Sequence, residues 1–174
     1  YRAMVEDRLS KVEKPYVMGT PEWVDAYEKL IQEDTVYKEA AKTWEGTVVI
    51  HILAKPELGL DKDTFMLMDL WHGDCRSVRL VPEGIGKNGD YVLTGELERW
   101  EAVMSKELDT TKAMMQGKIK LKGNLANIVR YVKASVRLTD LSAEIGSKFI
   151  TQLSDEERKE VIAYLNEARA EFGF

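Results

Sequence analysis

Apolar and polar residues alternate strictly over Gly117–Gly123 and then change to a helical spacing. Ile119 and Leu121 alternate with three lysines, which is the period-two pattern of a strand with one buried and one solvated face. Asn124 follows as a suitable N-cap. After it, apolar residues recur at helical intervals, at Leu125, Ile128, Val129, Val132 and Val136. The pattern predicts a short strand, a glycine turn and an amphipathic helix.

The same two periodicities divide the rest of the chain. Helices are predicted over 20–31, 34–44, 97–104, 109–115, 138–150 and 154–172, the last opened by a capping box of Ser154 and Glu157. Strands are predicted over 47–54, 64–73, 75–81 and 91–95. A meander of four strands and a fifth strand that crosses over, with helices around them, predict an α+β fold. Its sheet is five-stranded, mostly antiparallel and covered by helices.

The composition is typical of one globular domain. The chain has 174 residues, of which 44% are hydrophobic and 32% charged. No apolar run approaches the roughly 20 residues that cross a bilayer, and the N-terminus has no apolar signal core. Cys75 is the only cysteine, so we expect no intramolecular disulfide and a cytoplasmic location. Tyr1–Ala3 precede Met4, and we interpret them as the remnant of an expression tag.

Charge is distributed unevenly along the chain. The net charge is −5, but no Asp or Glu occurs between Thr110 and Thr139. That segment contains seven cations, namely Lys112, Lys118, Lys120, Lys122, Arg130, Lys133 and Arg137. The overall balance disfavours nucleic-acid binding. Two interpretations of the lysines remain open: a contact with an anionic membrane surface through Lys118, Lys120 and Lys122, or an edge strand protected from pairing with other chains.

Two groups of residues resemble functional motifs, one for dinucleotide binding and one for metal binding or nucleophilic catalysis. Neither group meets the requirements of its motif. Gly84–Gly89 matches G-x-G-x-x-G, but a strand rather than a helix follows it, so we expect a hairpin loop and no dinucleotide site. His51, His72 and Cys75 are too few for a metal site, and we expect no metal and no cofactor. An enzyme with Cys75 as nucleophile and a histidine as base stays open as a minor alternative.

Three stretches together resemble a known family. They are the Trp71–Gly73 hairpin, "YVLTGELERWEAVMSKEL" and "MMQGKIKLKGNLANIVR". Their order and spacing over Thr20–Leu138 are similar to those of the sterol carrier protein 2 family, the sterol-binding domain. The resemblance implies a five-stranded sheet covered by helices, with an apolar tunnel between them. Members bind sterols, fatty acids, acyl-CoA or phospholipids, and they are carriers rather than enzymes.

On this resemblance we expect a lipid-binding carrier whose tunnel is lined by thirteen residues. They are Ile50, Ile52, Phe65, Leu67, Trp100, Met104, Met114, Met115, Ile119, Leu121, Leu125, Ile128 and Val132. An error of one residue in strand phase would replace Phe65 and Leu67 by Met66 and Met68. The alternative function is an assembly subunit whose apolar groove takes a helix of a partner protein.

The resemblance also divides the chain into three parts: an N-terminal extension over 1–19, the lipid-binding core over 20–138 and a C-terminal helical extension over 139–174. The last helix has one apolar face, which must be buried. It could form a lid over the tunnel, an interface in a homodimer, or ordinary packing on the flank. As a lid, its removal would leave a folded protein that exchanges lipid faster.

Overall fold

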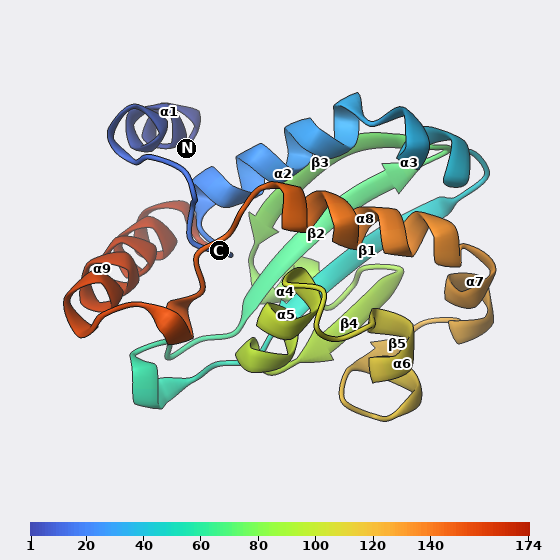
Figure 1. Cartoon of the computed structure of the whole chain (residues 1–174). Coiled ribbons are helices and arrows are strands. Elements are labelled where there is room, and N and C mark those ends of the chain that lie inside the picture. Colours follow the sequence, from blue (N-terminus) through green and yellow to red (C-terminus); the bar gives the residue numbers. More distant parts are fainter.

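The computed structural model describes residues 1–174 as one sheet with helices on both faces (Figure 1). The strands are β1 (Glu45–Ile52), β2 (Thr64–Trp71), β3 (Asp74–Val81), β4 (Tyr91–Gly95) and β5 (Lys120–Lys122). The helices are α1 (Arg2–Lys11), α2 (Pro21–Glu33), α3 (Thr35–Ala40), α4 (Glu83–Gly86), α5 (Leu97–Met104), α6 (Thr110–Met115), α7 (Leu125–Arg130), α8 (Val132–Glu144) and α9 (Asp155–Phe172). None of them is both long enough and apolar enough to cross a membrane.

The strand order is β3-β2-β1-β4-β5, and every neighbouring pair is antiparallel except β1 and β4. The α+β fold and the mostly antiparallel sheet are therefore confirmed. The four-strand meander is wrong, because β4 crosses the sheet to lie parallel to β1, with Ile50 opposite Leu93. Parallel neighbours require a crossover rather than a tight turn.

The glycine-rich segment Gly84–Gly89 belongs to this crossover and is not the hairpin loop that we expected. It contains most of α4, and none of its glycines has positive φ. Gly86 is needed for a different reason. A Cβ at this position would lie 2.4 Å from Cδ1 of Phe65, so glycine lets α4 approach β2 closely.

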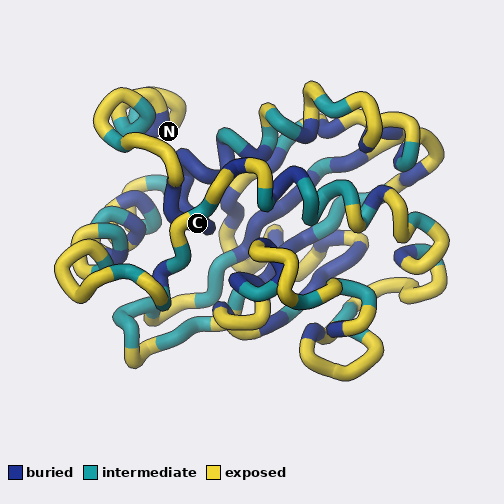
Figure 2. The backbone as a smooth tube through the Cα atoms, viewed as in Figure 1, coloured by how far each residue is buried: buried dark blue, intermediate teal, exposed yellow.

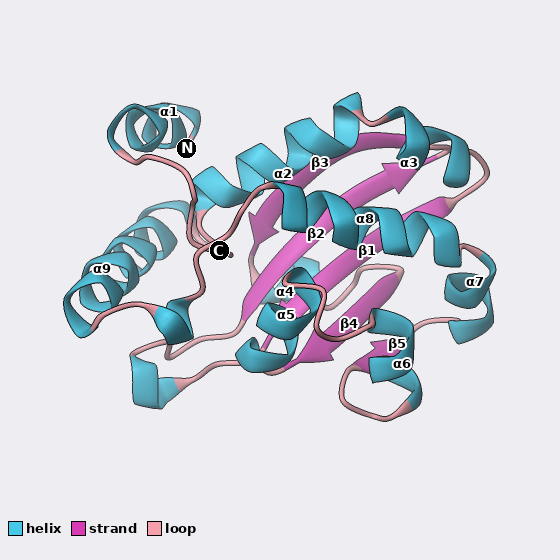
Figure 3. Cartoon of the chain, viewed as in Figure 1, coloured by secondary structure: helices cyan, strands magenta, loops and turns pink.

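The two faces of the sheet bury different sets of residues. One face, covered by α2, α5 and α8, holds a cluster of 33 buried residues (Figure 3). The other face, against which α4 packs, holds the smaller cluster Val49, Phe65, Leu67, Val81 and Val92. Figure 2 shows the buried residues gathered in the central strands and on the side of α2 that faces the sheet. The strands are thus covered on both faces.

Four of the predicted helix starts, at Thr20, Asp34, Asn124 and Ser154, are confirmed by their cap bonds. The Thr20 hydroxyl accepts from Trp23 N at 3.4 Å, and the Asp34 carboxylate from Tyr37 N at 2.7 Å. The caps Asn124 and Ser154 accept in the same way, each from the residue three positions on, at 3.3 Å. These bonds depend on neighbours in sequence, which is why the sequence alone predicts them. The helix predicted over 138–150 is wrong in both bounds, because α8 runs from Val132 to Glu144.

The predicted helix from Leu125 to Val136 is interrupted at Tyr131. That residue has φ −103° and ψ 33°, and it separates α7 from α8. Its hydroxyl lies 2.9 Å from Thr43 Oγ1, and its ring packs edge-on against Trp44 at 5.1 Å between centroids. These contacts hold Tyr131 towards the start of β1.

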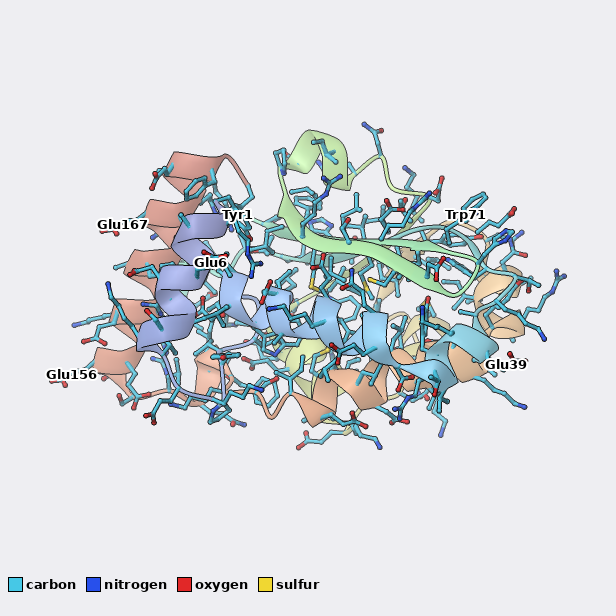
Figure 4. The ribbon with its side chains drawn as sticks, turned by 90° about the horizontal axis from the view of Figure 1, so that it is seen from above. Tyr1, Glu6, Glu39, Trp71, Glu156 and Glu167 are labelled. Carbon is cyan, nitrogen blue, oxygen red and sulfur yellow. The ribbon has the colours of Figure 1, made fainter.

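The two ends of the chain pack together beside α2 (Figures 1 and 4). Arg2 forms an ion pair with Asp25, and the ring of Tyr1 lies 5.4 Å from that of Phe172. Tyr1–Ala3, which we interpreted as the remnant of a tag, therefore contribute contacts to this junction. In Figure 4, Glu156 and Glu167 on α9 lie at the opposite end of the molecule from Glu39 and Trp71.

Candidate functional site

An apolar cavity of about 90 Å³ lies between the sheet and the helices that cover its larger cluster. Fifteen of its eighteen lining residues are hydrophobic. They are contributed by all the central strands and by six of the helices, with two residues from the linkers. The lining consists of Tyr27, Tyr37, Trp44, Val48, Ile50, Met68, Leu70, Leu93, Trp100, Val103, Met104, Thr110, Ile128, Tyr131, Ala134, Ser135, Leu138 and Thr139.

Strand alternation and one bulge position the floor of the cavity. In β1 and β2 the even-numbered residues face it, among them Ile50 and Met68. The register of β2 and β3 shifts after Asp69, so that Leu70 lies opposite Cys75 and Arg76 is the extra residue. Arg76 points outward and its guanidinium lies 2.9 Å from the Asp69 carboxylate. The bulge thus turns Cys75 into the core.

Four of the five aromatic residues of the lining, Tyr27, Trp44, Trp100 and Tyr131, place their polar atoms on protein partners. Tyr27 donates its hydroxyl to the carbonyl of Leu138 at 2.8 Å, and Trp100 donates Nε1 to the carbonyl of His51 at 3.1 Å. A buried N–H or O–H without a partner would be costly, so these bonds stabilise the wall. Because these polar atoms are bonded to the protein, a ligand in the cavity would contact mainly carbon atoms.

A paired charge ties α8 to the junction of α2 and α3. Arg137 donates Nε to Asp34 Oδ2 at 2.8 Å and Nη2 to Asp34 Oδ1 at 2.5 Å. The hydrogen bonds from Arg137 hold the pKa of Asp34 below its usual range, even though burial opposes this. The pair holds one wall of the cavity in place.

Of the thirteen residues predicted from the sequence, the structure brings Ile50, Trp100, Met104 and Ile128 to the cavity. Phe65 and Leu67 lie on the opposite face of the sheet, in the smaller cluster. The strand phase of β2 was therefore wrong by one residue, and Met68 takes the inward position. As contacts to a ligand, all of these residues remain predictions.

The other seven predicted residues do not line the cavity. Four of them pack in or against the larger cluster without reaching the cavity, namely Ile52, Met114, Ile119 and Leu121. The remaining three, Met115, Leu125 and Val132, are 72%, 39% and 41% exposed. Placing them inside was wrong. Leu125 and Val132 lie on the side of α7 and α8 that faces solvent on either side of the break at Tyr131, and Met115 is the last residue of α6 and points to solvent.

Several residues that line the cavity were not predicted to do so, although the sequence placed them on the apolar faces of helices. Tyr27, Tyr37 and Trp44 were assigned to amphipathic helices, but nothing in the pattern placed them beside the other walls. The strongest signal was aromatic clustering near the start of β1. Ser135 and Thr139 carried no signal, because polar residues in a helix are usually solvated.

The expected tunnel is not present as an open channel. A cavity of about 90 Å³ is smaller than the ~150 Å³ of an engineered cavity that binds benzene. A long hydrocarbon chain therefore fits only if the wall moves.

Cys75 and the histidines do not form a nucleophilic pair. His51 lies 2.7 Å from Asp63 and 2.8 Å from Thr94, and His72 lies 2.6 Å from Glu45. Neither histidine bonds to Cys75. Burial raises the pKa of the Cys75 thiol to about 12, so the geometry and the protonation state both oppose a reactive thiolate.

The helix α9 lies outside the cavity. Tyr164 donates its hydroxyl to Glu22 at 3.0 Å, and Arg169 donates to the carbonyl of Asp63 and the hydroxyl of Thr64, each at 3.0 Å. No residue of α9 lines the cavity. The lid interpretation is therefore wrong, and of the three alternatives the structure has packing on the flank. The apolar face of α9 is buried within its own chain, so it gives no reason to expect a homodimer.

Comparisons with known proteins identify the family and the fold. A family model described as the SCP-2 sterol transfer family matches residues 27–134. A crystal structure of sterol carrier protein 2 is 32% identical over 73% of this chain and 98% of that one, with a TM-score of 0.67. A conserved hypothetical protein from Thermus thermophilus is 30% identical over 78% of this chain and 94% of that one, with a TM-score of 0.69. No curated protein matches the chain.

Proposed function

The chain belongs to the SCP-2 sterol transfer family, and from this premise we propose that it is a carrier that holds a single apolar chain in the cavity between the sheet and α8. The observation that carries the proposal is the nearly continuous hydrocarbon lining. Burial yields about 0.8 kcal/mol per methylene, so a chain of about ten methylenes gains on the order of 8 kcal/mol before entropy costs. Affinity then needs few polar contacts.

Loading requires the cavity to widen, and the wall made by α7 and α8 is the part that moves. The strands of the floor are joined by backbone hydrogen bonds, whereas this wall is joined to the rest of the molecule by side chains alone. The links include those of Tyr131 with Thr43, Arg137 with Asp34 and Tyr27 with Leu138. The cavity is too small for the helix of a partner protein, whose diameter is roughly 10 Å. This difference in size favours a lipid chain over the groove-binding alternative.

Binding is tested by displacing an uncharged fluorescent probe that has a C10–C12 alkyl chain, and by mass spectrometry of an organic extract of the purified protein. Ala134, which lines the cavity, is replaced by phenylalanine, and the exposed Ala126 on α7 receives the same change as a control. We expect A134F to weaken probe binding at least roughly tenfold, a difference of about 1.4 kcal/mol, and A126F to bind normally. Equal binding by both variants and the wild type, with thermal melts showing that each is folded, would overturn the proposal.

We also propose that the protein contacts anionic membranes. The contact surface combines the lysines of the β5 segment with the outer side of α7 and α8. Lys118, Lys120 and Lys122 are exposed, although Lys122 donates to the carbonyl of Lys87 at 2.7 Å. The outer side of the two helices exposes four apolar residues, Leu125, Val129, Val132 and Val136. Arg130 and Lys133 lie between them, are exposed, and form no ion pair. Apolar side chains beside free cations match an anionic lipid surface.

Vesicle co-sedimentation tests the membrane contact. Each cation near an anionic surface contributes about 1 kcal/mol, and salt reduces this contribution. We expect binding to phosphatidylglycerol vesicles at low salt, its loss in V132E, and normal binding in I85E, where an exposed apolar residue on α4 is changed in the same way. Equal binding to neutral and anionic vesicles contradicts the proposal, and the lysines then serve only to protect the sheet edge.

A further inference from the structure

The apolar cavity adjoins a second, polar hollow of about 120 Å³ between α6 and α8. Thr110, Ser135 and Thr139 line both. We propose that this hollow is the subsite for an uncharged hydroxyl head, and that the ligand is an amphiphile whose chain fills the apolar cavity. The inference rests on the proposed carrier function and adds the class of ligand.

The hydroxyls at the junction are available to a guest. Thr110 and Ser135 form no side-chain hydrogen bond with another residue, and Thr139 donates only to the carbonyl of Ser135, at 3.3 Å. The three side chains are half-buried rather than fully solvated. Each hydroxyl both donates and accepts, so together they suit a head group that does the same. A hydroxyl does so, whereas an ionised carboxylate only accepts.

The charges around the hollow oppose an anionic head. Lys106 is its only cation, and Nζ of Lys106 already lies 2.9 Å from Asp140 Oδ1. Asp109 also lines the hollow, and its carboxylate caps α6 by accepting from Lys112 N at 2.9 Å. One cation and two carboxylates leave a net negative charge beside the head group. A carboxylate placed here meets like charge without a free partner, which selects against fatty-acid anions.

Two ligands of equal chain length test the selectivity. Decan-1-ol and decanoate compete with the fluorescent probe for the wild-type protein at pH 8, where decanoate is ionised. We expect the alcohol to bind roughly tenfold more tightly, the scale of one or two neutral hydrogen bonds and an avoided repulsion. The double variant T110V/S135A should lose about three- to tenfold in affinity for decanol and lose less for decanoate, so that the preference for the alcohol shrinks.

A matched control and a charge variant complete the design. Thr35 follows the cap Asp34 as Thr110 follows the cap Asp109, so T35V makes the same change in a helical first turn away from the hollow. We expect T35V to bind both ligands normally. Asp140→Asn removes one negative charge and frees Lys106, so it should raise the affinity for decanoate several-fold while leaving that for decanol unchanged.

Two results would overturn the inference. One leaves the proposed carrier function intact, and the other contradicts it as well. If decanol and decanoate bind the wild type equally and the variants change neither affinity, the subsite is wrong and the carrier function stands. If neither ligand displaces the probe and no lipid is found in the organic extract, the carrier function fails and the subsite fails with it.

Discussion

Tyr131 shows how one side chain decides which residues of a helical segment face the cavity. Its hydroxyl is held at Thr43 and its ring at Trp44. The chain therefore leaves the helical conformation between α7 and α8, and Ile128 and Ala134 face inward on either side of the break. If the helix had continued without a break, Val132 would have lain on the same face as Ile128 and would have pointed to the cavity.

The thiol of Cys75 gives a test at the residue scale. Because burial raises its pKa to about 12, almost no thiolate is present at pH 8, and the side chain is also shielded. We expect iodoacetamide to alkylate the native protein at least ~100-fold more slowly than a free cysteine peptide, and at the peptide's rate in denaturant. Fast alkylation of the folded protein would restore the nucleophile hypothesis.

At the scale of elements, the paired helices α7 and α8 form a wall that is joined to the rest of the molecule by side chains and by no backbone hydrogen bond. Their inner side lines the cavity, and their outer side exposes apolar residues and free cations. The proposed contact with a membrane would therefore act on the same wall that we propose moves for loading. The bidentate pair of Arg137 and Asp34 opposes that motion.

Removing this pair should loosen the wall. We expect R137M to lower the Tm by a few degrees and to speed uptake of the fluorescent probe, because Asp34 still caps α3 but no longer holds α8. Arg79→Met is the control, since Arg79 is exposed on β3 and forms no ion pair. Normal uptake in R137M would show that the wall opens without breaking this link.

The same pair predicts a dependence on pH. The pKa of Asp34 is lowered in the folded protein, so its stabilising contribution is fully present above its unfolded pKa of about 4 and is lost as the pH falls through the depressed value. We expect the difference in Tm between wild type and R137M to be constant from pH 8 to pH 5 and to shrink below about pH 4. A difference that is unchanged at pH 3 contradicts this assignment.

At the scale of the whole molecule, the cavity and the junction of the termini lie apart. The helix α9 packs beside α1 and α2, where Glu22 is almost fully buried and accepts from Tyr164 and Arg8. A buried carboxylate needs such partners. The C-terminal helix therefore completes the fold rather than covering the cavity.

Truncating a buried side chain of α9 separates stability from exchange. Leu165 is 9% exposed, so we expect L165A to reduce the free energy of unfolding by about 2–4 kcal/mol and to leave the rate of probe exchange unchanged. L53A, at a leucine that is 36% exposed, should be nearly neutral in both. Faster exchange in L165A under conditions where it is fully folded would support the lid after all.

Local signals in the sequence determined the elements and their ends. The caps at Thr20, Asp34, Asn124 and Ser154 are confirmed, because a cap bond joins residues three positions apart and needs no distant partner. The order of elements and the resemblance together gave the α+β fold. About a third of the predicted lining was brought to the cavity, mainly from elements that have one buried face.

Only the tertiary structure decided what depends on distant partners. β2 is apolar at every position from Phe65 to Met68 because the sheet is buried on both faces, and a strand buried twice carries no alternation from which its phase can be read. The crossover of β4, the break at Tyr131 and the docking of α9 likewise rest on contacts between segments far apart in the chain. The periodicity of a sequence predicts that one face of an element is buried. Which neighbour that face packs on is determined only by the tertiary structure.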